Sequence, residues 1–526
     1  MTVALNSKFQ SLIDSASQAL AEQNYQECHA HCIAAIKIDP RRGEPYFLLS
    51  RLTADHGNLG KALEIIDMAI GHEGRQPRLL AQRAKCLAML NRHEEAAKDA
   101  NEAAGEEPLD EFAAETLGVV FSRLGEHVKA VPLFQRASAK NSGNAEFQYN
   151  LAASLQFSGK FEDAESTYEH TIALKPNHHK AHYGLASLRN QANETARLEQ
   201  MVDLFRASAS PDEALHLGHA IAKTLEDMNA HEEALEYLLR AKQLKRDALD
   251  YDFSHDQALF EAAQRLANME VGPKLSDGEG PIFIVGMPRT GTSLVDRILS
   301  SHSGVVSMGE LAHFGLLLKQ ETGTASPFVL DGETLDRAMT ADLAAVGEGY
   351  LQVTERLRST SPMFIDKMPL NFFYAPLILA AIPNARVLCM RRNPMDTCVS
   401  NFRQLFSTSY SYYNYAYSLE DTGRYFLKFD ELVDIWSDAL PPDRFATVRY
   451  EDVVADQEGE THRLLDFCGL PFEEACLQFH ANPAPIATAS SVQVRSPIYA
   501  SSIDRWKKFG AGLAPLENLM RKAGRL

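Results

Sequence analysis

The sequence predicts an α-helical solenoid in its first half and an α/β domain with a parallel sheet in its second half. Two patterns support this division. Small residues recur every 34 positions up to about residue 171, and short β-branched runs followed by loops and amphipathic stretches begin near residue 281. Glycine, proline and charged residues fill the stretch between the patterns. We therefore expect a solenoid at 1–268, a linker at 269–280 and an α/β domain at 281–526.

Length and composition exclude several classes of protein. The chain has 526 residues, 45% of them hydrophobic and 23% charged, which is typical of a globular protein of about three or four domains. Its formal net charge of -18 disfavours nucleic-acid binding, because the long-range field repels a phosphate backbone. We see no basic segment followed by an apolar run at the N-terminus, and no apolar run long enough to span a membrane. Because the seven cysteines are few and odd in number, we expect a cytoplasmic protein without a disulfide framework.

The first half contains a strict repeat. Small residues stand near the start of successive predicted helices, each 34 positions after the last, at Cys28, Ala62, Ala96, Ala130 and Ala164. A second set follows seven residues later, from Ala35 to Thr171. Another unit contains Ala234 and Ala241, and the step of 70 from Ala164 to Ala234 leaves room for a divergent repeat. Small residues at fixed positions let antiparallel helices approach closely, so we expect about six or seven helical hairpins stacked with a concave face.

This pattern resembles the tetratricopeptide repeat (TPR). The resemblance implies a groove that binds peptides or partner proteins and has no chemistry of its own. Two roles stay open for the array: it recruits an acceptor or partner protein, or it only packs against the second half or in a homodimer. Cys28, His29, His31 and Cys32 have the residue types of a zinc site, but the repeat register favours Cys28 as a small core residue.

A phosphate-binding pattern opens the second half. Residues 281–285 predict a buried strand, Gly286 to Ser293 form a loop framed by glycines, and residues 294–300 predict an amphipathic helix. The backbone N–H groups of such a loop and the positive end of the helix bind anions. The glycine spacing matches the Walker A loop, but Thr292 stands where that loop has its lysine. This difference disfavours a P-loop kinase.

A second anion-binding pattern follows about a hundred residues later. Residues 385–390 predict another buried strand, which leads into Arg392, an Asn-Pro turn and, eight residues after Arg392, Ser400. A guanidinium and a hydroxyl at a helix suit a dianionic phosphate. The two patterns together resemble the sulfotransferases, which use 3′-phosphoadenosine 5′-phosphosulfate (PAPS). In that family an R-[DN]-P-x-D-x-x-x-S stretch binds the 3′-phosphate, and this sequence matches it at every position.

The resemblance covers residues 280–526 and implies further cofactor contacts. Tyr450 lies in an R-Y-E-D stretch, Lys507 lies in a W-K stretch, and residues 490–499 resemble a loop of the tyrosylprotein sulfotransferases that closes over the cofactor. The glycine-rich R-K-G segment of the cytosolic sulfotransferases is absent. The residues expected to bind PAPS or its product 3′,5′-ADP are Arg289, Thr290, Gly291, Thr292, Ser293, Arg392, Ser400, Arg403, Tyr450, Ser490, Gln493, Val494, Arg495, Tyr499 and Lys507.

Sulfuryl transfer needs a general base at the acceptor hydroxyl and donors at the bridging oxygen of the leaving phosphate. By resemblance, Glu310 in a G-E stretch is the base, and Lys367 and Ser490 act at the bridging oxygen. Arg289 is the cation of the loop. No metal is expected.

Two histidines, His302 and His313, are alternative bases, since the cytosolic sulfotransferases use histidine and its ordinary pKa suits the task. The prediction is therefore a PAPS-dependent sulfotransferase whose acceptor is most similar to protein or peptide tyrosine. A glycan or small-molecule hydroxyl acceptor stays open. The competing class is a non-catalytic TPR adaptor with a degenerate nucleotide-binding domain, which the intact set of motif residues disfavours.

Overall fold

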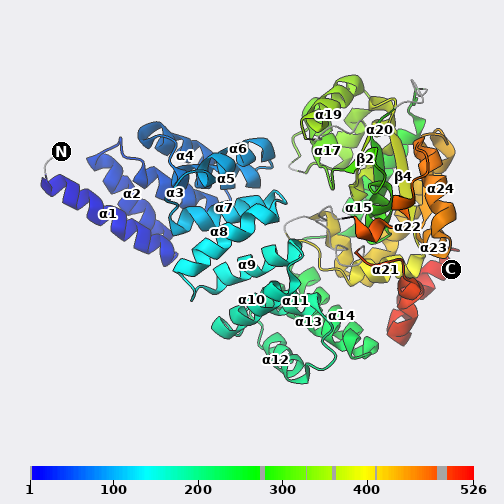
Figure 1. Cartoon of the computed structure of the whole chain (residues 1–526), viewed down its shortest axis with the longest axis horizontal. Coiled ribbons are helices and arrows are strands. Elements are labelled where there is room, and N and C mark those ends of the chain that lie inside the picture. Colours follow the sequence, from blue (N-terminus) through cyan, green and yellow to red (C-terminus); the bar gives the residue numbers. More distant parts are fainter. Residues whose placement is uncertain (1–2, 273–278, 327, 358–362, 409–410, 483–494) are drawn as a thin grey trace. The chain divides into compact units, whose positions relative to one another are not determined.

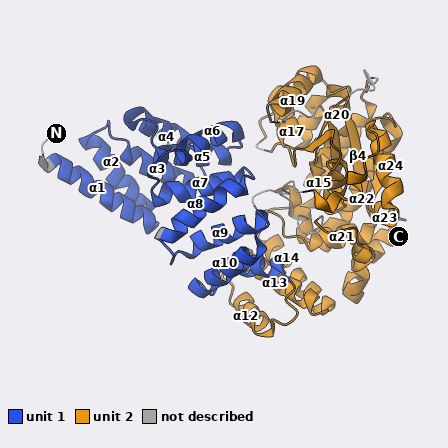
Figure 2. Ribbon diagram, in the orientation of Figure 1, with its two compact units in different colours: residues 1–189 blue, residues 190–526 orange. Residues whose placement is uncertain are grey.

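Helical hairpins and then a parallel sheet covered by helices follow one another along the chain, as the sequence predicted (Figure 1). The structure is a computed structural model and describes residues 3–272, 279–326, 328–357, 363–408, 411–482 and 495–526. Two compact units divide the chain, residues 1–189 and 190–526 (Figure 2). The expected limits of the solenoid, linker and α/β domain stay a prediction. The two compact units are defined by contacts between residues and not by the repeat pattern.

The first unit consists of paired antiparallel helices. Its helices are α1 (Val3–Ala21), α2 (Tyr25–Ile38), α3 (Glu44–Asp55), α4 (Leu59–Glu73), α5 (Pro77–Met89), α6 (His93–Ala104), α7 (Glu111–Arg123), α8 (His127–Lys140), α9 (Ala145–Phe157), α10 (Phe161–Leu174) and α11 (His179–Leu188). Asn24 and Asn58 stand 34 residues apart, and each caps the helix that follows it through its side-chain oxygen. Every small residue of the two predicted registers from Cys28 to Thr171 is buried. The repeat period therefore marks the positions where helices touch.

The second unit begins with four helices, α12 (Thr195–Arg206), α13 (Pro211–Asp227), α14 (His231–Asp247) and α15 (Phe253–Arg265). The α13–α14 hairpin carries Ala234 and Ala241, which are both buried as the repeat pattern predicts. The next helix, α15, is packed into the aromatic core of the second unit. The ring centroid of Phe260 lies 4.8 Å from that of Phe373 and 4.9 Å from that of Tyr425. These helices thus belong to the body that contains the sheet.

A five-stranded sheet with the order β2-β3-β1-β4-β5 forms the centre of the second unit, and all its pairings are parallel. Its strands are β1 (Ile282–Gly286), β2 (Val305–Ser307), β3 (Met363–Asp366), β4 (Arg386–Arg391) and β5 (Phe445–Arg449). β1 lies between β3 and β4, with Gly286 opposite Met390. The carboxyl ends of parallel strands meet at one edge, so the loops after β1, β3 and β4 come together there.

The main helices and 3-10 segments of this part of the chain connect the strands and follow the last of them. They are α16 (Thr292–Leu299), α17 (His313–Thr322), α18 (Gly332–Ala338), α19 (Leu343–Leu357), η2 (Pro369–Tyr374), α20 (Ala375–Ala381), α21 (Pro394–Phe402), η3 (Ser411–Tyr417), α22 (Leu419–Ala439), α23 (Tyr450–Ala455), α24 (Gln457–Cys468), η8 (Arg505–Leu513) and α25 (Ala514–Lys522). Within the described parts of the chain, none of the helices combines the length and the apolar character needed to cross a membrane.

A buried carboxylate ends β3. Asp366 accepts a hydrogen bond from the hydroxyl of Tyr350 at 2.8 Å and another from the backbone N–H of Leu311 at 3.3 Å. Burial raises the pKa of Asp366 from its usual 3.8 to about 7, although both hydrogen bonds and the charge of Lys367 act in the opposite direction. Asp366 therefore joins α19, the loop after β2 and the end of β3 in one polar contact.

A methyl group added at Gly118 should destabilise the first unit. A Cβ at this position of α7 would lie 2.7 Å from the buried ring of Phe134, so the ring must move. We expect Gly118→Ala to lower the free energy of unfolding by about 1–3 kcal/mol. The control is Gly71→Ala on α4, where no atom lies within 4 Å of the added carbon. It should raise stability by about 0.5–1 kcal/mol through helix propensity. Urea unfolding followed by circular dichroism measures both, and equal effects would contradict close packing at Gly118.

Stability should also depend on pH through Asp366. Because its pKa is raised, the folded protein holds a proton that the unfolded chain releases above about pH 4. The free energy of unfolding should therefore fall as pH rises from about 4 to about 7. The asparagine side chain in Asp366→Asn does not titrate, so the free energy of unfolding of this variant should fall less over the same pH range. Urea unfolding across this range tests the difference, with the exposed Asp438→Asn as control. The same slope in the wild type and in Asp366→Asn would be evidence against a raised pKa.

Candidate active site

The loop between β1 and α16 has a backbone that only small or strained residues can follow. Gly286 has φ +139° and Gly291 has φ +104°, and a Cβ at either would lie 2.7 Å from a neighbouring atom, Met390 O and Tyr450 Cδ2 respectively. Arg289 between them also has a positive φ of 68°. The two glycines thus let the loop pack against β4 and against Tyr450, which keeps it close to both.

Hydroxyl groups shape this loop and the first turn of the helix. Thr290 is fully buried and donates a hydrogen bond to Met287 O at 2.7 Å, so its side chain closes the loop on itself. Thr292 and Ser293 are the first two residues of α16 and are both buried. The N–H groups of a first helical turn have no partner within the helix and form a natural site for an anion.

Arg392, one residue after β4, reaches across to the same loop. It donates from Nη1 to Arg289 O at 2.9 Å and from Nη2 to Ser502 O at 2.5 Å. Its guanidinium carbon lies 4.6 Å from the ring centre of Tyr450. Its buried Nε has no hydrogen-bond partner among the residues that the structure describes. The structure therefore brings Arg289, Arg392 and Tyr450 together around the glycine loop.

Helix α21 is fixed against the loop by asparagines. The side chain of Asn393 caps its first turn, and Asn401 donates to Pro288 O at 2.7 Å. Ser400 precedes Asn401 and is half-buried. Sequence reasoning did not select Asn401, although an asparagine beside a predicted ligand on a helix is a signal that could have drawn attention to it.

The segment that precedes and opens η8 is held by Asp396. This buried carboxylate accepts hydrogen bonds from the backbone N–H groups of Asp504 at 2.7 Å and Trp506 at 3.0 Å. Lys507 follows directly and forms a 2.6 Å ion pair with Asp504 in an exposed position. The motif position of Asp396 was visible in the sequence, but its role as an anchor for this distant segment was not.

The remaining residues expected to bind the cofactor differ in their contacts and in their exposure to solvent. Arg403 forms an ion pair with Glu226 of α13. Arg495 and Tyr499 are exposed. Ser490, Gln493 and Val494 lie outside the described residues, so their assignment stays a prediction.

Glu310 and Lys367 come from two loops and form an ion pair. Lys367 Nζ lies 2.5 Å from Glu310 Oε1, and the backbone N–H of Lys367 donates to Gly309 O at 2.9 Å. The side chain of Lys367 is 2% exposed, whereas that of Glu310 is 42% exposed. The pair therefore joins a buried cation to a carboxylate that solvent and other molecules can reach.

A second carboxylate, Asp296 on α16, also acts on Lys367. Burial raises the pKa of Asp296, and the charge of Lys367 lowers it in part. Its Oδ1 is buried and has no hydrogen-bond partner within the described parts of the chain. Sequence reasoning missed Asp296, although an acidic residue in a short helix that is otherwise largely buried is unusual enough to suggest a role.

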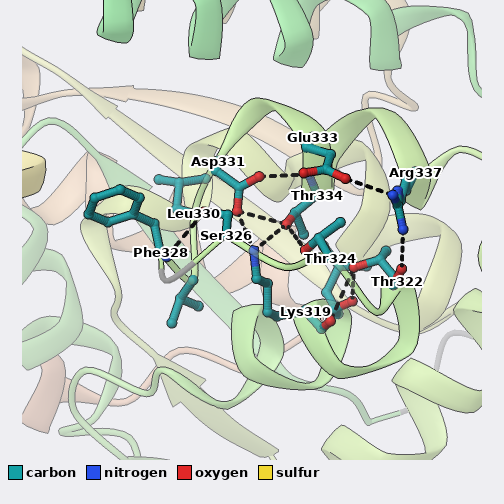
Figure 3. Close-up of polar contacts among 12 residues, drawn as sticks. Lys319, Thr322, Thr324, Ser326, Phe328, Leu330, Asp331, Glu333, Thr334 and Arg337 are labelled. Atoms are coloured by element: carbon teal, nitrogen blue, oxygen red, sulfur yellow. Dashed lines mark hydrogen bonds and ion pairs between the residues drawn. The ribbon is translucent and has the colours of Figure 1, made fainter. Parts of the chain in front are cut away.

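The helix after Glu310 is secured by a polar network. Lys319 on α17 donates to Asp331 Oδ2 at 2.6 Å and to Thr334 Oγ1 at 3.0 Å, and Asp331 caps α18 by accepting from Thr334 N–H (Figure 3). This network ties α17 to α18. Because α17 starts three residues after Glu310, the contacts also limit how far the Glu310 loop can move.

The two alternative bases differ in their surroundings. His302 is buried, accepts at Nδ1 from Gly304 N–H at 3.0 Å, and has Nε2 3.1 Å from Pro471 O. Both ring nitrogens of His302 are thus used within the fold. His313 is the half-buried first residue of α17.

The cysteine and histidine cluster in α2 does not converge on one point. Cys28 and Cys32 are fully buried, and burial raises the pKa of both thiols, whereas His29 is exposed. No group of three or more metal-ligating side chains occurs among the residues for which coordinates are described. Cys28 fills a small position in the repeat core, as its register predicts.

Comparisons with known proteins agree with this architecture. Residues 281–474 match the model of the sulfotransferase family, and residues 53–238 match the model of the N-terminal TPR repeats region of Psidin. An uncharacterised protein from Aquifex aeolicus is 26% identical over 405 residues, which are 75% of this chain and 53% of that protein. The protein-tyrosine sulfotransferase of Drosophila melanogaster is 22% identical over 238 residues, which are 43% of this chain and 46% of that protein. The chain thus spans about half the length of these two relatives.

Solved structures of both kinds are also similar. The sulfotransferase domain of the Synechococcus PCC 7002 olefin synthase is 20% identical, with a TM-score of 0.34, and the match covers 49% of this chain and 98% of that domain. A thermophilic TPR protein of Thermus thermophilus is 20% identical, with a TM-score of 0.30, and the match covers 34% of this chain and 98% of that protein. Two parts of the chain thus match known families: residues 281–474, which contain the parallel sheet, match the sulfotransferase family, and residues 53–238, which form helical hairpins, match a region of TPR repeats.

Proposed function

We propose that the protein transfers a sulfuryl group from PAPS to a hydroxyl acceptor, with protein or peptide tyrosine as the acceptor class. The observation that carries this proposal is the convergence of three loops at one edge of the sheet. The glycine loop after β1, Lys367 after β3 and Arg392 after β4 follow neighbouring parallel strands. Lys367 also contacts Glu310, which adds a carboxylate to the same edge.

The donor groups of the chain fit a nucleotide with two separate phosphates. The loop and the first turn of α16 offer backbone N–H groups and the hydroxyls of Thr292 and Ser293 for a 5′-phosphosulfate. Arg392 has a buried Nε without a hydrogen bond to the described residues, and Ser400 lies on the helix that follows, which suits a 3′-phosphate. Tyr450 packs on both the glycine loop and Arg392, so its ring is placed where it can contact the adenine of a bound nucleotide. No lysine stands at the P-loop position, so a triphosphate has less charge to pair with.

PAPS would supply an activated sulfuryl group: a bond would form between the acceptor oxygen and sulfur, and the bond between sulfur and the bridging oxygen of the 5′-phosphate would break and release 3′,5′-ADP. Glu310 is the base that takes the proton of the acceptor hydroxyl, since it is exposed enough to meet an acceptor. Lys367, buried beside it, would donate to the bridging oxygen and balance the charge that develops there. The ion pair between Lys367 and Glu310 keeps these two side chains next to each other within the fold.

The tyrosine acceptor is supported by two kinds of observation. Relatives from Caenorhabditis and Drosophila carry the name protein-tyrosine sulfotransferase, with 21–23% identity in the aligned regions. The helical repeats offer an extended surface of the kind that binds peptides. A glycan or a small phenol uses the same base and the same bridging-oxygen donor, so the acceptor assay must include them.

The first test concerns the donor. Because a charge-assisted contact to the 3′-phosphate contributes about 1.5–3 kcal/mol, 3′,5′-ADP should bind at least about tenfold more tightly than ADP or ATP. Calorimetry measures the three affinities. Arg392→Gln should remove the preference, while Arg449→Gln, an exposed arginine at the end of β5, should keep it. Mass spectrometry should detect sulfation of tyrosine peptides in preference to glycans and phenols. Equal binding of ATP and 3′,5′-ADP would contradict the proposed donor.

The second test concerns the base. Glu310→Gln keeps the size of the side chain but cannot accept the proton, so turnover should fall by about 10²–10⁴-fold while 3′,5′-ADP affinity stays within about twofold. Glu348→Gln on α19, another exposed glutamate, is the matched control and should leave turnover unchanged. If His313→Ala abolishes turnover and Glu310→Gln does not, the base has been assigned to the wrong residue.

A further inference from the structure

A buried carboxylate on a repeat helix holds two arginines of the sulfotransferase domain. Glu226 lies at the end of α13 and its side chain is 3% exposed. Arg403 binds it side-on through two hydrogen bonds, with Nε 2.6 Å from Oε1 and Nη2 on Oε2. Arg505 adds a third hydrogen bond, from Nη2 to Oε2 at 2.8 Å. Burial acts to raise the pKa of Glu226, but the two arginines lower it overall, so the group is charged at neutral pH.

The two arginines belong to two segments expected to contact the cofactor, the helix that carries Ser400 and the segment that carries Lys507. Arg403 caps the end of α21, three residues after Ser400, and its backbone N–H donates to Val399 O of that helix. Arg505 opens η8, two residues before Lys507. Glu226 is therefore a bridge between the end of α21 and the segment that carries Lys507.

Other residues of the α13–α14 hairpin hold the same region. Lys242 on α14 is 1% exposed and donates to Ala416 O at 2.9 Å and Gln404 O at 3.3 Å. Its ammonium lies 5.0 Å from the ring centre of Phe402, the last residue of α21. The ring of His231 lies 5.5 Å from that of Phe509 in η8. The hairpin thus packs on both segments, and Glu226 supplies the charged contact between them.

We propose that Glu226 is a positioning residue of the donor site, and that the α13–α14 hairpin is in this way part of the 3′-phosphate site. This inference rests on the proposed function, because it assigns a task to the segments that would hold PAPS. Glu226 does not contact the nucleotide in this proposal. It fixes the spacing between α21 and η8, so that Arg392, Ser400 and Lys507 meet one phosphate together.

Glu226 could affect phosphate binding through its negative charge or by positioning the two segments, and these two roles predict different effects of E226Q. If Glu226 acts only through its charge, E226Q leaves two arginines unneutralised and strengthens phosphate binding, while R505A removes a cation and weakens it. If Glu226 acts by position, both substitutions break the bridge and both weaken binding. The double variant E226Q/R505A separates the two effects, because it leaves the cluster with the same net charge as the wild type.

The measurement is the ratio of the affinities for 3′,5′-ADP and 5′-AMP, obtained by calorimetry on the full chain. The two nucleotides differ only in the 3′-phosphate, so the ratio reports on that subsite and not on general stability. We expect E226Q, R505A and the double variant each to lower the ratio by about tenfold, comparable to the loss of one charge-assisted contact. Glu236→Gln on α14, an exposed glutamate of the same hairpin, is the control and should keep the wild-type ratio.

Circular dichroism and the melting temperature establish first that each variant is folded. If E226Q does not fold, E226D takes its place, because it keeps the charge and shortens the side chain, so it should lower the ratio only if Glu226 acts by position. An unchanged ratio in the double variant, or opposite changes in the two single variants, would overturn the inference. A wild type that does not distinguish 3′,5′-ADP from 5′-AMP would instead overturn the proposed function, so the two failures can be told apart.

Discussion

The parallel pairing of β1 with β3 on one side and β4 on the other is the constraint on which the candidate site depends. It places the carboxyl ends of three strands side by side, so that residues more than a hundred positions apart share one edge of the sheet. The pairing itself depends on close approach at Gly286, where a side chain would meet Met390 O at 2.7 Å. A bulkier residue there would push the loop away from β4 and from Arg392, which follows it.

The same edge concentrates buried ionisable side chains. Lys367 is buried beside Glu310, Asp366 has its pKa raised to about 7 by burial, and Asp296 has an unpaired buried oxygen among the described residues. Burying ionisable groups opposes folding unless each finds a partner. Their accumulation at the carboxyl edge, where parallel sheets bind ligands, is what a site for charged substrates requires.

Local sequence patterns predicted the helices and strands of this structure, but they did not predict most of the contacts between them. The 34-residue step predicted that Cys28 and its equivalents are buried, and the strand–loop–helix pattern predicted β1, α16 and the loop that joins them. The sequence did not predict the short strand β2 or the ion pair between Glu226 and Arg403, which are 177 residues apart. Such a pair leaves no trace in local spacing, because each partner alone resembles a surface charge. Only the three-dimensional packing shows that both are buried.

The irregular step in the repeat pattern has a structural counterpart. The strict period ends at Ala164 and Thr171, and the next unit, with Ala234, comes 70 residues later instead of 34 or 68. The boundary between the compact units, at 189/190, falls within this interval. Helices α13 and α14 keep the small buried residues of a repeat, but their other contacts are made by Glu226 and Lys242 with the sulfotransferase domain. Helices α13 and α14 therefore combine the buried small residues of a repeat with side chains that contact the end of α21 and η8.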